Sequence, residues 1–286
     1  MNFPTSIPET LSVKEFQTLV YDRAKLCYRD LPWRHSSDPY KIWVSEIMLQ
    51  QTQVVRVISK YTNWLERFPD VLTLAQAEPA EVLKFWSGLG YNRRALSLHQ
   101  AAQDIVRHFS GQLPCEEKEL LSLPGIGKYT ARAILAFAYD FPSVFLETNI
   151  RTVYIKHFFA GMESVPDSAL EEIGRRYLDC ESPRRWYTAL MDCGADIKKK
   201  EGNYSIKSRL YTKQSPFESS FRRVRGAVLK SLLDSGPATT QQLYMRLPFE
   251  YEKVTEALQV LVKEGFLRVS SFSSEHVDEE PQYSIP

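Results

Sequence analysis

The sequence lacks the features that mark several large classes of protein. Its four cysteines are scattered and form no CxxC pair, so neither a disulfide framework nor a metal site is indicated. No apolar run approaches the roughly 20 residues of a membrane helix. The start, MNFPTSIPETLSVKEF, has neither the basic beginning nor the apolar core of a signal peptide. We therefore expect a folded cytoplasmic protein with no membrane segment.

The sequence also lacks an excess of charge of either sign, because 36 Lys and Arg against 35 Asp and Glu leave a net charge of +1. That average argues against a nucleic-acid partner, but the charge is unevenly spread. Residues 184–225 contain eleven basic and four acidic residues, a local net charge of +7. The binding of a polyanion depends more on the charge of such a local stretch than on the net charge of the whole chain. A solvated face or linker is the plainer interpretation, and charge alone favours it.

Continuous β-alternation is missing from the first 200 residues, whereas helical spacing is abundant there. The spacing predicts helices over 13–29, 41–58, 79–87, 94–109, 116–122, 128–139, 147–160, 167–179 and 184–194. A polar break follows near 198–216. Three further helices, at about 218–235, 238–247 and 250–264, precede a terminal hairpin, which is the outline of a winged helix. We expect a mainly α protein with domains at 1–216 and 217–286.

The segment LPGIGKYTARAIL contains a glycine-rich turn directly before a helix. Gly125 and Gly127 leave backbone N–H groups exposed at the helix start, where they can hold a DNA phosphate without reading sequence. Lys128 follows with a positive charge. A lone GxG would favour an ordinary turn between helices. The apolar residues that fix both flanking helices make DNA phosphate binding the preferred hypothesis.

Two glutamates are candidates for acid–base chemistry. On a helix, Glu46 has Ile42, Trp43, Leu49 and Gln50 as its neighbours, so burial among apolar groups would raise its pKa and suit a general acid. Glu147 stands at a helix start, where the helix dipole favours a carboxylate. An exposed helical Glu and a simple helix cap are the plainer interpretations. Glu46 and Glu147 together would form the carboxyl pair that glycosidic bond cleavage requires.

These clusters, taken in order, resemble the helix-hairpin-helix DNA glycosylases of the endonuclease III superfamily, and most closely those of the MutY type. The resemblance covers about 31–214 and rests on LPWRHSSDPYKIWVSEIMLQQTQV, WSGLGYNRRALSLH, LPGIGKYTARAILAFAY, LETNIRTV and MDCGA. It implies a fold of two helical lobes. It also implies excision of adenine paired with 8-oxoguanine or guanine in base excision repair.

The resemblance also implies roles for individual residues. Glu46 matches the general acid, Glu147 the carboxylate that stabilises the sugar cation, and Asn149 a residue that supports both. Tyr129 stands where bifunctional relatives have Lys, so hydrolysis without a lyase step is expected. The expected DNA contacts are Gln50, Gln51, Leu89, Tyr91, Gly125, Gly127, Lys128, Lys207 and Arg209. Among these, Gln51, Leu89 and Tyr91 resemble residues that wedge into the duplex during base flipping.

The chain departs from the family pattern in three ways. Glu replaces Asp at 147, which extends the carboxylate by about one methylene. The four cysteine ligands of the family's [4Fe–4S] cluster are replaced, in the loop 198–214, by Lys198, Ser205, Ser208 and Gln214. We therefore expect no cluster and no metal, although a monovalent cation at the hairpin is allowed. A winged-helix-like unit replaces the Nudix-like domain that reads 8-oxoguanine.

The loop 198–214 invites a further expectation. Lys207 and Arg209 keep positive charge there, and a small core of Tyr204, Ile206, Leu210 and Tyr211 could replace the cluster. The acidic third helix of the C-terminal unit favours docking to a protein over base reading.

The expected protein is a monomer at a bacterial nucleoid, bound to duplex DNA that contains a mismatched or damaged pair. Two alternatives remain open. One is a thymine or uracil glycosylase acting opposite guanine. The other is a DNA-binding module without catalysis, although binding alone would not need Glu46, Tyr129 and Asn149 together.

Overall fold

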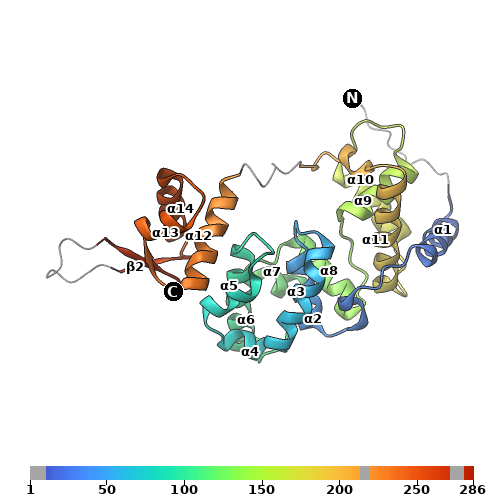
Figure 1. The fold of residues 1–286 in the computed structure, drawn as a ribbon. Coiled ribbons are helices and arrows are strands. Elements are labelled where there is room, and N and C mark those ends of the chain that lie inside the picture. The colour runs from blue at the N-terminus through green and yellow to red at the C-terminus, as the bar shows by residue number, and fades with distance from the viewer. Residues whose placement is uncertain (1–10, 213–219, 271–279) are drawn as a thin grey trace. The chain divides into compact units, whose positions relative to one another are not determined.

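The computed structural model describes residues 11–212, 220–270 and 280–286. The elements follow one another along the coloured ribbon of Figure 1, and the described part of the chain is mainly helical. They are α1 Val13–Leu26, η1 Pro32–His35, α2 Pro39–Leu49, α3 Val54–Arg67, α4 Val71–Gln76, α5 Pro79–Trp86, α6 Arg93–His108, α7 Glu117–Ser122, α8 Lys128–Tyr139, α9 Thr148–Phe158, α10 Asp167–Tyr177, α11 Pro183–Lys200, η2 Tyr204–Lys207, α12 Phe221–Ser235, β1 Ala238–Thr239, α13 Thr240–Arg246, α14 Tyr251–Lys263, β2 Arg268–Ser270 and β3 Gln282–Ser284. None of the described helices has the length and apolar character of a membrane span.

The contacts between residues divide the chain into two compact units. The first combines residues 1–51 with 104–212, and the second combines 52–103 with 213–286. The first unit therefore contains α2, α7, α8, α9, α10 and α11, and the second contains α3, α4, α5 and the C-terminal elements. A domain boundary at 216/217 stays a prediction.

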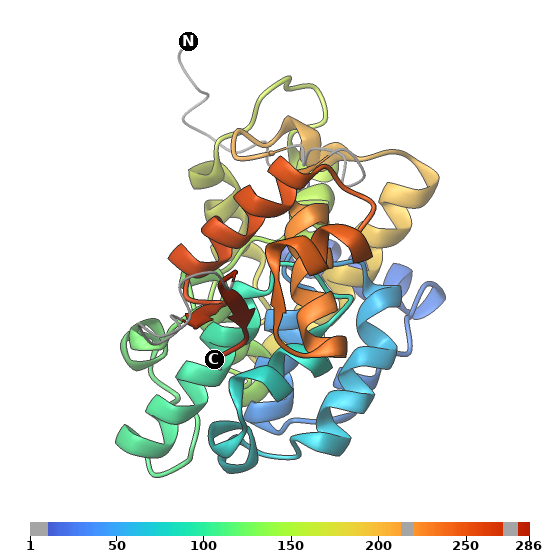
Figure 2. The ribbon, with the colours of Figure 1, turned by 60° about the vertical axis from the view of Figure 1, so that its left-hand side comes forward.

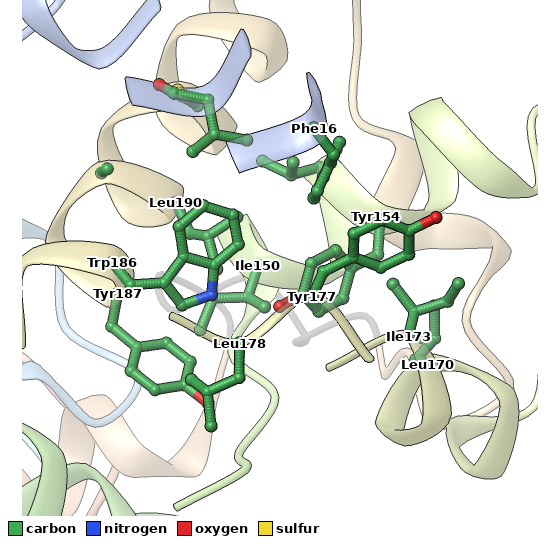
Figure 3. Packing of buried hydrophobic residues seen from close by; sticks show 14 of the residues in the cluster. Phe16, Ile150, Tyr154, Leu170, Ile173, Tyr177, Leu178, Trp186, Tyr187 and Leu190 are labelled. Carbon is green, nitrogen blue, oxygen red and sulfur yellow. The ribbon is translucent and has the colours of Figure 1, made fainter. Parts of the chain in front are cut away.

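Large aromatic side chains form the core of the first unit, between α1, α9, α10 and α11. Phe16 lies 4.9 Å from Tyr177 and 6.0 Å from Trp186, ring centroid to ring centroid, and both pairs pack edge to face. Figure 3 shows these rings with Tyr154 and Tyr187 around Ile150. Buried aromatic side chains contribute much of the stability of a core. This core fixes α9 and α11, which carry the residues described below.

The segment 41–58 is not one helix, contrary to the prediction. Helix α2 ends at Leu49, and α3 begins only at Val54. Between them Gln51 adopts a φ of 55°, a left-handed conformation that stops a right-handed helix. Four polar residues, 50–53, interrupt the apolar pattern at the break, but polar residues alone do not end a helix. The prediction also omitted α3 beyond residue 58 and the short helix α4.

The C-terminal elements occur close to where the sequence pattern placed them. Helices α12, α13 and α14 accompany a three-stranded antiparallel sheet in the order β1-β3-β2, seen at the red end of the ribbon in Figure 2. Strand β1 pairs Ala238 with Tyr283, and β2 pairs Val269 with the same tyrosine. Strand β1 was not predicted. The name winged helix stays a prediction for this arrangement.

Candidate active site

Helix α2 carries Glu46 into the interior. The helix starts cleanly because Asp38 caps it through the N–H of Tyr40 and Pro39 occupies its first position. Both faces of α2 are largely apolar and buried, and Glu46 is only 6% exposed. Desolvation, with a smaller contribution from the nearby Glu147, raises the pKa of the Glu46 carboxyl to about 7, although the hydrogen bond from Tyr129 opposes the rise. The predicted burial of this carboxyl is confirmed.

Tyr129 lies one residue into α8 and points its hydroxyl at Glu46. The Tyr129 O–H donates to Oε2 of Glu46 over 3.2 Å. The Tyr129 ring packs edge to face on Phe145, with 5.6 Å between the ring centroids. Burial and the two glutamates raise the pKa of Tyr129 well above its usual value, so the phenol stays protonated. A neutral donor therefore orients the Glu46 carboxyl.

Glu147 is the N-cap of α9, as its position at a helix start predicted. Its Oε2 accepts the backbone N–H of Asn149 at 2.7 Å, and the Asn149 side-chain amide lies 3.4 Å from Oε1. Burial raises the pKa of the Glu147 carboxyl, whereas the N–H of Asn149, Arg29 and Lys198 oppose that rise. Hydrogen-bond donors and cations thus oppose the protonation of Glu147, whereas at Glu46 the hydrogen bond from Tyr129 opposes desolvation. The two carboxyls have different environments.

A glycine missed as a site residue lets α11 approach the backbone at Asn149. Gly194 belongs to the motif MDCGA, and a Cβ built there would lie 2.2 Å from the carbonyl oxygen of Asn149. The same Cβ would lie 2.6 Å from the Cβ of Asn149. No side chain fits at such distances, so only glycine allows this helix contact. The GA of the motif was the available signal.

An ion-pair network also went unpredicted. Asp192, from the same motif, is 1% exposed and accepts Nε of Arg29 at 2.6 Å and Nη1 of Arg34 at 2.8 Å. Arg29 is one of the cations that stabilise the carboxylate of Glu147. A buried carboxylate needs such partners. The network therefore links the LPWR segment and α11 to the charge of the site.

The hairpin between α7 and α8 presents its backbone outward. Gly125 has a φ of 80°, which only glycine adopts easily, and Gly127 caps α8 without a side-chain hydrogen bond. Gly125, Gly127 and Lys128 are exposed, whereas Ile126 is buried and anchors the turn. The first N–H groups of a helix have no acceptor within it. This surface suits a phosphate, and the monovalent cation at the hairpin stays a prediction.

The two glutamines after α2 differ from each other in their surroundings. The side-chain amide of Gln50 donates to Oγ1 of Thr130 over 3.0 Å, which ties the end of α2 to α8. Gln51 is exposed, and its left-handed backbone marks the end of the helix. Non-glycine residues in that conformation are concentrated at functional sites. Gln51 is therefore placed as a surface contact would require, whereas Gln50 is half-buried.

The turn that contains Leu89 and Tyr91 lies in the second unit. Leu89 is only 4% exposed, so its side chain supports the turn from inside. Tyr91 is 38% exposed and has a φ of 49°. The Arg94 guanidinium donates to the carbonyls of Leu89 and Gly90 at 3.3 and 3.0 Å. The half-buried Arg94 thus holds the turn and lies against the Tyr91 ring.

The loop after α11 is closed by hydrogen bonds and does not fit an iron–sulfur cluster. Ser208 is 4% exposed. Its hydroxyl accepts a hydrogen bond from Nη1 of Arg151 at 3.0 Å and donates one to Oδ1 of Asp167 at 3.2 Å. Ser205 is 1% exposed and bonds Asn203 at 2.7 Å. Neither serine offers a thiolate, and Gln214 lies outside the described residues. Backbone bonds between Val165 and the loop complete the closure.

The predicted apolar core in this loop is wrong. Ile206, Leu210 and Tyr211 are 56%, 68% and 43% exposed, and only Tyr204 packs against the core of the first unit. Polar side chains hold the loop, so its apolar side chains are not needed inside. Lys207 donates from Nζ to the carbonyl of Ala160 at 2.7 Å. Arg209 is exposed, as a contact with DNA would require.

Comparison with known proteins agrees with this geometry. Residues 44–177 match the model of the HhH-GPD superfamily base excision DNA repair proteins. The chain is 33% identical to the adenine DNA glycosylase of Mycolicibacterium smegmatis over 275 residues, covering 84% of this chain and 88% of that one. It is 38% identical to the adenine DNA glycosylase of Buchnera aphidicola subsp. Baizongia pistaciae over 59% of this chain, which spans about half of that relative (48%).

Solved structures show the same fold. A thermostable thymine-DNA glycosylase matches with a TM-score of 0.59 and 25% identity over 67% of this chain and 90% of that one. Endonuclease III in a non-covalent DNA complex matches with a TM-score of 0.53 and 14% identity over 74% of this chain and 93% of that one. The chain belongs to the HhH-GPD superfamily of base excision DNA repair proteins, in the family that includes the adenine DNA glycosylases.

Proposed function

We propose that this protein is a monofunctional DNA glycosylase that hydrolyses the N-glycosidic bond of adenine mispaired with 8-oxoguanine or guanine. The observation that carries the proposal is the buried Glu46 carboxyl, whose pKa is raised to about 7 and which Tyr129 orients. A general acid works best when its pKa lies near the working pH. The identity to adenine DNA glycosylases over most of the chain supports adenine as the base.

The two carboxyls divide the work of hydrolysis. Glu46 in its protonated form donates to the adenine ring, which weakens the bond between the base and C1′ of the sugar. As that bond breaks, positive charge develops on the sugar, and the Glu147 carboxylate stabilises it. Water then adds hydroxide to C1′ and releases a proton to the carboxylates or solvent. The products are adenine and an abasic site.

Tyr129 supports hydrolysis without strand cleavage. A lyase step needs an amine that forms a Schiff base with the opened sugar, and a phenol cannot form one. Because the pKa of Tyr129 is raised, its oxygen also stays protonated and is a poor nucleophile. We expect borohydride to trap no covalent adduct between this protein and an abasic duplex.

The proposed enzyme works without a [4Fe–4S] cluster. In place of metal ligands, the contacts of Ser208 with Arg151 and Asp167 close the loop after α11. Iron analysis of protein purified without oxygen tests this part of the proposal. Stoichiometric iron bound to active protein would contradict it.

The deciding experiment compares duplexes that contain A·8-oxoG, A·G, T·G or U·G, with alkali used to cleave abasic sites. We expect breaks at adenine only, and Glu46→Gln should lower the single-turnover rate by about 100-fold or more because it cannot donate the proton. Breaks at thymine or uracil would instead identify a mismatch glycosylase, an outcome that the structural match to a thymine-DNA glycosylase makes worth testing. Tight binding without any break would identify a binding module.

The proposal includes the expected partners. The protein would act as a monomer on duplex DNA in the bacterial nucleoid. The C-terminal unit would dock on a protein, since Glu252 and Glu256 on α14 lie outside its buried face.

A further inference from the structure

The turn that presents Tyr91 is contacted by an arginine from far along the chain. Nη1 of Arg222, on the first turn of α12, donates to the Tyr91 hydroxyl over 2.6 Å. The Arg222 guanidinium also lies 5.6 Å from the centroid of the Tyr91 ring. A planar guanidinium binds an aromatic ring through its face and a hydroxyl through its N–H groups. One side chain of the C-terminal unit thus makes both kinds of contact with this tyrosine.

The contact belongs to a wider attachment of the C-terminal elements to the same segment. Nη2 of Arg93, next to the turn, donates to the backbone carbonyl of Glu264 over 3.2 Å. The Glu264 carboxylate pairs with Arg225 of α12 as well as with Arg93. The Arg93 guanidinium lies 5.6 Å from the centroid of the Phe266 ring. These contacts hold α12 beside the turn and so fix the position from which Arg222 reaches Tyr91.

The backbone of the turn shows why such support matters. Tyr91 has a φ of 49°, in the left-handed region that a residue with a side chain rarely occupies. Arg94 and the indole N–H of Trp86 bind the carbonyl of Gly90 at 3.0 Å each, which fixes the backbone before Tyr91. Neither bond holds the end of the Tyr91 side chain. The Arg94 guanidinium lies 5.5 Å from the centroid of the Tyr91 ring, and Arg222 adds the hydrogen bond to the hydroxyl, which holds the far end of the side chain.

We propose that Arg222 is a positioning residue for Tyr91, so that the C-terminal unit sets the orientation of a side chain that enters DNA. The proposal rests on the proposed function, because Tyr91 enters the duplex only if the protein flips a base out of DNA, as that function requires. Positioning by a preorganised neighbour lowers the cost of ordering a side chain on binding. The C-terminal elements then contribute to base excision through Tyr91, without themselves reading a base.

The first test needs no DNA. Hydrogen exchange of the amides of residues 88–92 is measured in the full-length free protein, for wild type, Arg222→Ala and the control Lys230→Ala. Lys230 lies on the same helix, and its charge pairs with Asp234. We expect Arg222→Ala to speed exchange about three- to tenfold, the loss of roughly one hydrogen bond, and Lys230→Ala to leave it unchanged. Equal exchange in all three proteins would overturn the proposal.

The second test separates positioning from direct binding of phosphate. Single-turnover rates on an A·8-oxoG duplex are measured for Arg222→Ala, Tyr91→Phe and the double variant. If Arg222 acts through the Tyr91 hydroxyl, each single variant loses about three- to tenfold and the double variant loses little more. Multiplied losses, together with a salt slope of binding that falls by about one in Arg222→Ala, would show a phosphate contact and overturn the proposal.

Rescue by a conservative change gives a third readout. Arg222→Lys keeps the charge but loses the planar fork, so it should restore the slow exchange of residues 88–92 poorly. Full restoration by lysine would show that charge alone suffices and would contradict the proposal. The failures are distinguishable: a wild-type protein that excises no adenine refutes the proposed function, whereas unchanged exchange at residues 88–92 refutes the role of Arg222.

Discussion

The buried Glu46 and the half-buried Glu147 differ in their immediate neighbours. Glu46 has apolar groups around it, so desolvation favours its protonated form despite the hydrogen bond from Tyr129. Burial raises the pKa of Glu147 as well, but backbone N–H groups, Arg29 and Lys198 oppose that rise. Carboxyls whose environments differ in this way can act as an acid and as a charge stabiliser. At the scale of single residues, this asymmetry is the strongest support for glycosidic hydrolysis.

The pH dependence of excision follows from Glu46. Its acid form is the one that donates, and its pKa is raised to about 7. We expect the single-turnover rate to be nearly constant on the acidic side and to fall about tenfold per pH unit above about 7. Rates measured between pH 5 and 9 under saturating enzyme test this expectation. A rate that still rises above pH 8 would contradict the assignment of Glu46 as the acid.

The same shift predicts an effect on stability that needs no substrate. Because the folded pKa is raised, the contribution of Glu46 is full below its unfolded pKa of about 4.5 and is lost as the pH rises to about 7. Glu46→Gln removes this loss, so it should stabilise the protein by up to about 3 kcal/mol at pH 8 and by little at pH 4. Chemical denaturation at both pH values measures the difference. Equal effects at the two would exclude a raised pKa.

At the scale of helices, the site depends on how closely α9 and α11 approach. Figure 1 shows these two helices side by side, and a Cβ at Gly194 would overlap the backbone of Asn149. The capping bond of Glu147 is made by the N–H of the same Asn149. The packing of α9 against α11 therefore determines the position of the Glu147 carboxylate.

Gly194→Ala should damage activity more than stability. The added methyl must push α9 from α11, with a cost of about 1–3 kcal/mol, and a displacement of Glu147 near 1 Å should lower the single-turnover rate about 100-fold. Gly226→Ala is the matched control, because Gly226 lies in α12 with no atom within 4 Å of its added Cβ. The control should be neutral or slightly stabilising. Full activity in Gly194→Ala would show that the contact is dispensable.

At the scale of the whole molecule, the near-zero net charge includes a strongly basic stretch of the chain. The net charge of +1 includes the basic stretch 184–225, which carries +7. Lys207 and Arg209 belong to this stretch and lie on the loop that hydrogen bonds, rather than cysteine ligands, hold in place. Their positive charge is therefore kept on a closed loop, as phosphate binding would require.

The double variant Lys207→Ala, Arg209→Ala should weaken DNA binding through electrostatics. If each side chain meets one phosphate, the slope of log affinity against log salt should fall by about two. Fluorescence anisotropy with a labelled duplex from low to physiological salt measures this slope. Lys118→Ala is a suitable comparison, because Lys118 lies outside the basic stretch. An unchanged slope would remove this loop from the DNA interface.

Local chemistry in the sequence predicted the surroundings of the two glutamates, whereas their assignment to a site came from the family resemblance. The burial of Glu46 followed from its helical neighbours, and the cap at Glu147 followed from its position at a helix start. The break after α2 was missed because the four polar residues 50–53 are compatible with a continuous helix, and the left-handed conformation of Gln51 is not visible in the sequence. The expected apolar core near Ile206 was wrong because composition does not show whether apolar packing or hydrogen bonds will hold a loop.

The sequence by itself determined the residue types: a carboxyl set among apolar neighbours, a glycine hairpin, a tyrosine in place of an amine, and serines in place of cysteines. These follow from local spacing, which the chain carries in its order. Only the tertiary structure decided which distant groups meet, as Tyr129 meets Glu46, Gly194 meets Asn149, and Arg222 meets Tyr91. The reason is that long-range contacts depend on how helices pack, and packing is a property of the whole core.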